Sequence, residues 1–271
     1  MTSVASTVAG PPPPATRRRI RVRGLVQGVG YRPFVHRLAT ELALVGHVGN
    51  DTDGVFVEVE GAAPALDAFE DRLRREAPPL ARVDAVESSP IEAVGQTGFQ
   101  IVESRSDSAV RTFVAPDAAV CDDCLRELFD PADRRYRYPF ITCTNCGPRF
   151  TITIRLPYDR PNTTMAGFPL CDVCAGQYHD PTDRRFHAQP LACPGCGPTA
   201  WLESGDGRID GTDAAIAGAQ QALADGKVVA VKGLGGYHIA CAAGSDEAVA
   251  RLRQRKGRAA KPFAVMARDV A

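Results

Sequence analysis

The sequence lacks an excess of charge of either sign. Its 271 residues include 32 lysines and arginines and 32 aspartates and glutamates, so the formal net charge is zero. A dedicated nucleic-acid-binding protein usually carries a clear basic excess. The composition therefore argues against a nucleic-acid partner.

Long hydrophobic runs are also missing. No stretch approaches the run of about 18 apolar residues that a membrane-spanning helix needs, so we expect no membrane partner. Residues 1–16 are small and proline-rich, without the cationic start and apolar core of a signal peptide, and we interpret them as a disordered leader. We therefore expect a cytoplasmic protein, whose cysteines stay reduced and hold metal more often than disulfides.

Cysteine, in contrast, is abundant and clustered. Eight of the nine cysteines form four CxxC pairs. Each half of this stretch reads CxxC, eighteen residues, CxxC, and the second half repeats the first at an offset of fifty residues. The surrounding sequence repeats as well, since DPADRRY at 130–136 returns as DPTDRRF at 180–186. The duplication predicts two metal sites, built from Cys121, Cys124, Cys143, Cys146, Cys171, Cys174, Cys193 and Cys196.

Two pairings of these CxxC turns are open. Zinc in structural sites prefers four thiolates in a tetrahedron, and two CxxC turns supply four. Duplication favours consecutive pairing, because an ancestral single unit needed a complete shell of its own, whereas an interleaved arrangement joins the first turn to the third. A closed thiolate shell leaves no position for catalysis, so we expect two structural zinc ions. His179 and His187 are then surplus as ligands, and we assign them to loops.

The repeated DPxDRR segments have two readings of their own. Their arginines can bind an anion or a partner, or they can pair locally with Asp133 and Asp183 and pack around the fingers.

The first module, residues 17–104, alternates strand and helix patterns. We predict a strand at 20–26, a helix from Arg32 to a stop at Gly46, and two strands near Val48 and at 55–59 joined by the turn 50–54. A helix at 65–75 and strands at 83–91 and 99–102 follow. This order indicates a ferredoxin-like unit with one additional strand.

A glycine loop joins the first strand to the first helix. Gly28 and Gly30 bring backbone N–H groups to a helix N-terminus, which suits a phosphate, and the planar guanidinium of Arg32 can clamp an anion. Such a loop also occurs for packing reasons alone. His36, one turn beyond Arg32, is expected on the helix surface.

The string VRGLVQGVGYRPF at 22–34, together with Asn50, resembles the acylphosphatase family across nearly all of this module. The resemblance implies a ferredoxin-like fold in which Asn50 orients the attacking water and Arg32 anchors the phosphate. An acyl phosphate is already activated, so positioning suffices without a metal or a covalent nucleophile. The implied phosphate-binding residues are Gln27, Gly28, Val29, Gly30, Tyr31 and Arg32.

In the last stretch, 207–271, we predict a helix containing Ile216 to Ala224, a buried strand at 227–233, a helix at 246–255 and another apolar strand after Lys261. Cys241 is expected in the core. Three cations at 256–261 border the last strand, which suits a phosphate or nucleotide but also a solvated surface.

ALADGKVVAVKGLGGYHIAC at 222–241 and RQRKGRAAKPFAVM at 253–266 resemble the start of a YrdC-like nucleotide-binding domain. An acylphosphatase module, paired four-cysteine fingers and a YrdC-like segment, in that order, resemble the HypF family of carbamoyltransferases, which act in NiFe hydrogenase maturation. The motif KGLGGYH at 232–238 agrees with this family in particular. The implied nucleotide-binding residues are Lys232, Lys256, Arg258 and Lys261.

The resemblance implies an α+β multidomain chain. Its parts are a disordered leader (1–16), an acylphosphatase-like domain (17–104), a tandem zinc-finger module (110–200) and a truncated α/β YrdC-like domain (207–271). It implies carbamoyl phosphate as substrate, ATP and two zinc ions as cofactors, and HypE as the protein partner of the full-length enzyme.

The sequence departs from the family by ending at Ala271, where the YrdC-like fold needs much more chain. We therefore expect a fragment that retains only the hydrolysis of carbamoyl phosphate, and a final segment with an exposed sheet edge. The alternative function is a non-catalytic zinc scaffold for a protein or RNA, which leaves the pairing of Arg32 with Asn50 unexplained.

Overall fold

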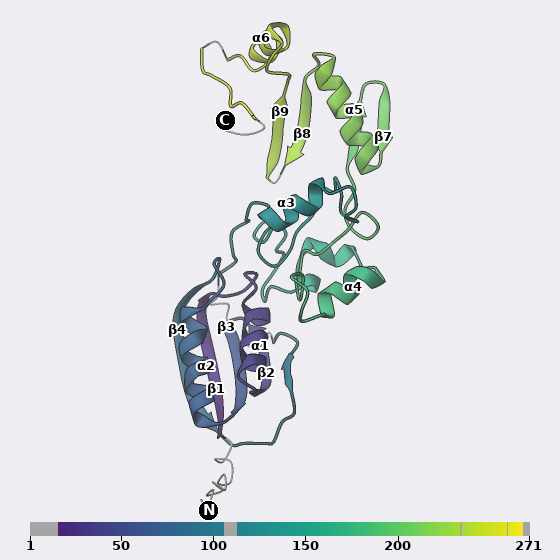
Figure 1. Cartoon of the computed structure of the whole chain (residues 1–271). Helices are drawn as coiled ribbons and strands as arrows, with labels where there is room; N and C mark the ends of the chain where they lie inside the picture. The colour runs from purple at the N-terminus through teal and green to yellow at the C-terminus, as the bar shows by residue number, and fades with distance from the viewer. Residues whose placement is uncertain (1–15, 106–112, 234, 259, 268–271) are drawn as a thin grey trace, which may run out of the picture. The chain divides into compact units, whose positions relative to one another are not determined.

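The computed structural model describes residues 16–105, 113–233, 235–258 and 260–267 (Figure 1). It forms two compact units, Met1–Gly197 and Pro198–Ala271. Of the expected leader, residues 1–15 lie outside the described residues, and Thr16 is the first residue of a strand. Among the described residues, no helix combines the length and hydropathy that a membrane crossing requires.

The first unit begins with a five-stranded sheet of order β4-β1-β3-β2-β5, and two helices, α1 and α2, lie against it (Figure 1). The ferredoxin-like fold is confirmed, and the additional strand is β5, which runs parallel to β2 at the edge of the sheet. The elements are β1 (Thr16–Leu25), α1 (Tyr31–Glu41), β2 (Val45–Asp51), β3 (Gly54–Gly61), α2 (Ala63–Arg75), β4 (Arg82–Ile91) and β5 (Phe99–Ile101).

The alternation of β1 explains how this sheet divides apolar from charged side chains. Ile20 and Val22 are fully buried in the core, because successive residues of a strand point to opposite faces. Arg19, Arg21 and Arg23, on the other face, pair with acidic residues of neighbouring strands and turns. One boundary was wrong, since α1 ends at Glu41 and Val45 already belongs to β2.

The finger module consists mostly of turns around two short helices. The helices α3 (Asp122–Phe129) and α4 (Asp172–His179) each begin directly after the first cysteine of a finger and are related by the fifty-residue offset. Two 3₁₀ turns, η1 (Arg160–Asn162) and η2 (Thr164–Gly167), lie between the fingers. His187 lies in a turn as expected, whereas His179 is the last residue of α4 rather than a loop residue.

Where the structure describes the second unit, it contains two hairpins and two helices. The helices α5 (Thr212–Ala224) and α6 (Asp246–Arg255) match the expectations, and β8 (Val229–Gly233) is the expected strand. Its predicted burial was wrong, because Val229 alone of its residues is buried. The strands β6 (Trp201–Ser204), β7 (Gly207–Asp210) and β9 (Gly236–Ala240) were missed. The strand expected after Lys261 was wrong, because residues 260–267 form none.

The hairpin β8–β9 leaves apolar side chains in contact with solvent. Val231, Tyr237 and Ile239 are all exposed, and the described residues pair these two strands only with each other. The exposed edge expected for this segment is therefore present. Cys241, which follows β9, is only half-buried, so its assignment to the core was wrong.

Candidate functional site

The glycine loop places several main-chain N–H groups at the start of α1. Gly28 and Gly30 have left-handed φ angles of 72° and 75°, which glycine adopts without the steric cost that other residues bear. The first N–H groups of a helix have no intrahelical partner and bind anions. The side chain of Tyr31 turns into the core, where its hydroxyl donates to Leu73 O at 2.9 Å, so Tyr31 offers only its backbone to this loop.

Arg32 lies beside the loop and is almost buried. Its guanidinium pairs with the Asp159 carboxylate at 2.8 Å, and it contacts Ser104 Oγ and the Tyr158 carbonyl oxygen, each at 3.4 Å. Asp159 and Tyr158 belong to the finger module. The residue expected to anchor a phosphate is thus held by an anionic group from another part of the chain.

Asn50 is buried without side-chain partners. The residue lies in β2 and is 1% exposed, and both atoms of its amide, Oδ1 and Nδ2, lack a hydrogen-bond partner among the described residues. Buried polar groups are normally hydrogen-bonded, because leaving them unpaired costs free energy. Asn50 is therefore available for a ligand or a water molecule.

Arg149 joins the finger module to the glycine loop. Its buried guanidinium donates to Gly28 O at 2.8 Å, to Gly147 O at 2.8 Å and to Thr144 O at 2.7 Å. Arginine presents five donors in a fixed plane, so one side chain serves acceptors from both parts. Arg149 therefore fixes the first finger against the loop.

Gln27 makes a second connection between the two parts. Its side-chain nitrogen donates to Asp51 O at 2.7 Å and to Gly54 O at 2.9 Å, and its oxygen accepts from the Tyr158 N–H at 3.0 Å. The Gln27 side chain thus braces the β2–β3 turn and the finger module. Val29, also in the loop, belongs to the apolar core.

One cavity contains both parts of this arrangement. Its volume is about 20 Å³, which is on the scale of a single water molecule. Its lining includes Gly28, Gly30, Tyr31, Arg32 and Asn50 from the ferredoxin-like fold, and Thr144, Arg149, Tyr158, His187 and Gln189 from the fingers.

His187 faces this cavity in its neutral form. Burial, assisted by the positive charge of Arg32, lowers the pKa of His187 to about 3. His36 lies on α1, and its ring contacts Phe186 and Phe99 edge to face. His36 is absent from the lining of this cavity.

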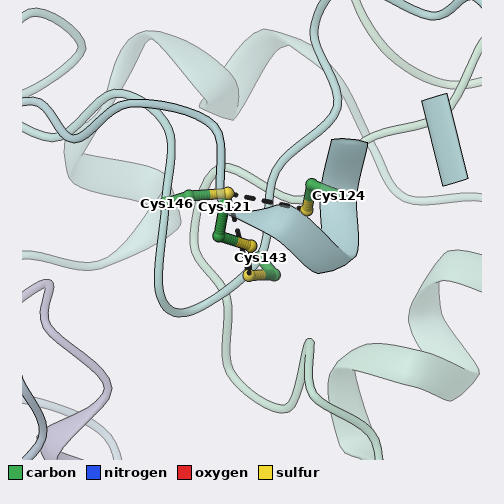
Figure 2. Close-up of side chains that lie close together, drawn as sticks. All are labelled: Cys121, Cys124, Cys143 and Cys146. Carbon is green, nitrogen blue, oxygen red and sulfur yellow. Dashed lines mark hydrogen bonds between the residues drawn. The ribbon is translucent and has the colours of Figure 1, made fainter. Parts of the chain in front are cut away.

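The eight cysteines form two separate clusters. The sulfur atoms of Cys121, Cys124, Cys143 and Cys146 lie within 4.8 Å of one another (Figure 2). Those of Cys171, Cys174, Cys193 and Cys196 do the same. Consecutive pairing is therefore confirmed, and the interleaved alternative is wrong.

The sulfur separations fit zinc. In the first cluster Cys143 Sγ is 3.7 Å from Cys121 Sγ and 3.8 Å from Cys146 Sγ. A tetrahedron with zinc–sulfur bonds of about 2.3 Å has edges of about 3.8 Å. Each cluster thus has the donors and the spacing of a closed four-thiolate zinc site, and no histidine belongs to either.

The duplicated arginines reach across from each finger to the other. Arg134 of the first finger donates to Cys193 Sγ at 3.1 Å in the second cluster, and Arg184 donates to Cys124 Sγ at 3.2 Å in the first. Arg135 Nε donates to Ala192 O at 2.9 Å, and its counterpart Arg185 donates to Thr142 O at 3.1 Å. The two fingers brace each other symmetrically.

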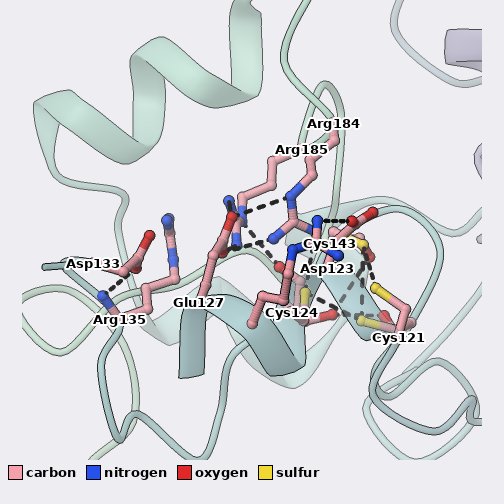
Figure 3. A network of polar contacts seen from close by, with 12 residues as sticks. Cys121, Asp123, Cys124, Glu127, Asp133, Arg135, Cys143, Arg184 and Arg185 are labelled. Carbon is pink, nitrogen blue, oxygen red and sulfur yellow. Dashed lines mark hydrogen bonds and ion pairs between the residues drawn. The ribbon is translucent and has the colours of Figure 1, made fainter. Parts of the chain in front are cut away.

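Glu127 of the first finger forms ion pairs with two arginines of the second finger. Figure 3 shows the Arg184 and Arg185 side chains converging on it. Burial raises the pKa of Glu127, but the two arginines outweigh burial and lower the pKa to about 2. Local pairing, one of the two readings of these segments, was wrong for the arginine side chains. Asp133 and Asp183 accept the main-chain N–H groups of Arg135 and Arg185, and Asp183 also accepts from the Gln177 side chain.

The structure does not gather the four cations predicted for a nucleotide. Lys232 lies in β8 with its ammonium 5.3 Å from the centre of the Tyr237 ring, while Lys256 caps α6. A pocket beside α6 is lined by Arg258 but not by the other three. Lys261 offers its main-chain oxygen to Arg253 at 3.1 Å.

Three residues of this site, Tyr158, Asp159 and Arg149, were not predicted from the sequence. A signal for them exists in the broken repeat, because CGPRF at 146–150 has CGPTA as its counterpart at 196–200. The duplicated fingers diverge at Arg149, and the segment after it, which carries Tyr158 and Asp159, has no copy in the second half. Residues at which one copy of a repeat differs from the other do not serve the structural role that the copies share, and they are candidates for a different role.

Comparisons with known proteins agree with this division. An acylphosphatase family model matches residues 18–101. A model described as HypF finger matches residues 120–153 and 170–203. The Sua5, YciO and YrdC model, described as telomere recombination, matches residues 221–271.

Individual relatives cover the chain or one of its parts. The carbamoyltransferase HypF2 of Cupriavidus necator is 60% identical over 262 residues, which are 96% of this chain and 32% of the relative. An acylphosphatase of Caldivirga maquilingensis is 45% identical over 92 residues and is 92% covered. A crystal structure of full-length HypF in the phosphate- and nucleotide-bound form is 49% identical with a TM-score of 0.89, over 97% of this chain and 34% of that one.

The chain spans about a third of the length of these HypF relatives. Within that third it carries the acylphosphatase fold, two four-cysteine clusters and a partial YrdC-like segment. The chain belongs to the HypF carbamoyltransferase family, as the N-terminal part that joins an acylphosphatase domain to paired fingers and the start of a YrdC-like domain.

Proposed function

We propose that the chain hydrolyses carbamoyl phosphate to carbamate and inorganic phosphate at the cavity between the glycine loop and the fingers. The observation that carries the proposal is Asn50, whose buried amide has no hydrogen-bond partner in the part of the chain that the structure describes. It lines the same cavity as Arg32 and the glycine loop. These are the groups that an acyl phosphate and one water molecule require.

In the proposed reaction the N–H groups of the loop and the guanidinium of Arg32 hold the phosphoryl oxygens. The Asn50 Oδ1 accepts a hydrogen bond from the attacking water and aims its oxygen at phosphorus. A bond from that oxygen to phosphorus forms while the bond from phosphorus to the bridging oxygen breaks. Carbamate leaves with the electron pair, and the water proton passes to phosphate and solvent. Phosphoryl transfer of this kind depends on positioning and electrostatics.

Entry of the substrate requires Asp159 to leave Arg32. The cavity is about 20 Å³, which is on the scale of one water molecule. The Asp159 carboxylate is an anion at 2.8 Å from the guanidinium, so it stands where a phosphoryl oxygen would pair. The phosphoryl group replaces it, because both are anionic acceptors for the same donors.

The relatives support a wider role for the family-length protein. We propose that ATP binds through Lys232, Lys256, Arg258 and Lys261 in the complete YrdC-like domain and forms a carbamoyl adenylate. The carbamoyl group then passes to HypE, for cyanide ligand synthesis on the hydrogenase iron. We place these steps in the cytoplasm, where thiols remain reduced. For the chain itself we assign 17–104 to the acylphosphatase domain, 110–200 to the fingers and 207–271 to the nucleotide-binding segment.

Phosphate release from carbamoyl phosphate tests the proposal. Arg32→Ala and Asn50→Ala should each lower kcat/KM by about 100-fold or more, the scale seen when a positioned electrostatic group is removed. The matched control is Arg37→Ala, which removes an exposed guanidinium from the same helix. Full activity in both site variants would contradict the proposal, and salt-dependent RNA binding without turnover would favour a zinc scaffold instead.

A further inference from the structure

Tyr158 is a second buried residue with an unused polar group at this cavity. It is 3% exposed, and its hydroxyl lacks a hydrogen-bond partner among the described residues. Its main chain is fully engaged, since the N–H donates to Gln27 at 3.0 Å and the carbonyl accepts from Arg32 at 3.4 Å. The residue is therefore fixed in place, while the one group that faces no protein acceptor is its hydroxyl.

The Tyr158 ring lies directly on the glycine loop. Its Cε1 and Cδ1 atoms lie 3.2 and 3.3 Å from the position that a Cβ atom would take at Gly28, so a side chain at Gly28 would displace the ring. Tyr158 and Asn50 both line the cavity. Two unpaired polar side chains at one small cavity indicate a polar guest, because burying either without a partner is costly.

We propose that Tyr158, contributed by the finger module, is a substrate-binding residue of the acyl phosphate site, where its hydroxyl donates a hydrogen bond to the phosphoryl group. The inference rests on the proposed hydrolysis of an acyl phosphate. It makes the site a composite of the acylphosphatase fold and the fingers.

Tyr158 and Asn50 have different roles because their side chains offer different hydrogen-bonding groups. Burial raises the pKa of Tyr158 to about 12, so the hydroxyl remains a donor across the neutral range. Ionised phosphoryl oxygens accept hydrogen bonds and donate none. Tyr158 lies against the glycine loop that is expected to hold these oxygens. Asn50 offers both an acceptor and a donor, which suits it to a water molecule instead.

The test compares Tyr158→Phe with the wild-type chain, and it uses inorganic phosphate as the probe. The variant removes one oxygen and keeps the ring against Gly28. The dissociation constant of phosphate, measured by calorimetric titration, should rise about ten-fold, the lower end for a hydrogen bond to a charged group. The KM for carbamoyl phosphate should rise in parallel. Tyr136→Phe, at an exposed tyrosine of the first finger, should change neither.

A stability measurement separates binding from a structural role. Because the described part of the chain offers the hydroxyl no partner, Tyr158→Phe should unfold at a urea concentration no lower than wild type, with its zinc content unchanged. A purely structural hydroxyl predicts lower stability and unchanged phosphate affinity. Phosphate affinity within two-fold of wild type would overturn the inference.

Two further readouts keep the outcomes distinct. If the wild-type chain binds phosphate but releases none from carbamoyl phosphate, the proposed function fails while the phosphate titration still decides the role of Tyr158. If Tyr158→Phe does not fold, NMR of the wild-type chain labelled at the tyrosine Cζ replaces it. Phosphate should then shift the Tyr158 resonance but not that of Tyr136, and an unmoved Tyr158 signal would overturn the inference.

Discussion

Arg32 and Asp159 form a 2.8 Å ion pair between the acylphosphatase fold and the finger module. The proposed reaction uses the arginine of this pair and not the aspartate, which comes from the finger module. In the free protein it neutralises a nearly buried guanidinium, which would otherwise lack a counter-ion. The same carboxylate competes with the phosphoryl group for Arg32.

Asp159→Asn should therefore tighten phosphate binding. With the competing charge removed, the dissociation constant of inorganic phosphate should fall about ten-fold, which corresponds to about 1.4 kcal/mol. The free energy of unfolding should fall by about 2 kcal/mol, because Arg32 loses its buried partner. Calorimetric titration and urea unfolding measure the two effects. Asp206→Asn, at an exposed turn of the second unit, is the control, and weaker phosphate binding by Asp159→Asn would contradict the competition.

Arg149→Met should detach the first finger from the glycine loop. The substitution keeps an unbranched apolar side chain but leaves the carbonyls of Gly28 and Thr144 without their donor, whereas Gly147 O keeps the N–H of Ala118. Each buried acceptor left unpaired costs about 1–3 kcal/mol, and partial hydration of the loosened junction reduces the sum, so we expect a loss of about 3 kcal/mol in urea unfolding. Arg155→Met removes an exposed arginine of the same module. Equal stability of the two variants would contradict the role of Arg149 in joining the first finger to the glycine loop.

Each of the two crosswise arginines is predicted to support zinc binding in the other finger. Arg134→Ala should weaken zinc at Cys171, Cys174, Cys193 and Cys196, and Arg184→Ala should weaken zinc at the first cluster. Groups that hydrogen-bond metal ligands change affinity by about 10- to 100-fold. Chelator competition should show about two zinc ions per chain. In each variant one of the two ions should be released earlier than in wild type, and cysteine NMR identifies the cluster that loses it. Loss from the arginine's own finger would contradict the cross-brace.

The pH dependence of stability should contain a contribution from His187. Burial and the charge of Arg32 lower its pKa to about 3, whereas the unfolded chain takes up the proton near pH 6.5. The unfolded state therefore binds more protons between these values, and stability is lost as the pH falls below about 6.5.

Between pH 7.5 and 5.5 the free energy of unfolding of His187→Asn should fall by about 1 kcal/mol less than that of wild type. Asparagine suits the left-handed backbone at this position, where φ is 54°. His179→Gln, at an exposed site, is the matched control, and parallel pH profiles for wild type and His187→Asn would contradict the assignment.

Local patterns made much of the fold predictable. The alternation in β1 and the glycine loop are properties of short segments, and the cysteine spacing identified both clusters because two CxxC turns can close one shell. The edge position of β5 was not readable, since three residues carry too little pattern to choose a partner strand. The hairpin β6–β7 was missed for a similar reason, because its side chains are mostly exposed and give no apolar alternation.

The candidate site was predictable on one side only. Arg32 and Asn50 came from a resemblance to a family, and the structure brings both to one cavity. Tyr158, Asp159 and Arg149 come from an irregular segment, where no periodicity relates a residue to its contacts. The crosswise pairing of Arg134 and Arg184 was equally hidden, because a repeat shows that two units exist but not which surfaces face each other.

Isotope incorporation from labelled water tests the central claim most directly. The chain is incubated with carbamoyl phosphate in ¹⁸O-labelled water, and the released phosphate is analysed by ³¹P NMR. Attack at phosphorus by the water that Asn50 orients predicts one labelled oxygen in each phosphate, formed by the wild-type chain and Arg37→Ala but not above background by Arg32→Ala or Asn50→Ala. Unlabelled phosphate from the wild-type chain, or equal labelling by all four proteins, would contradict the account.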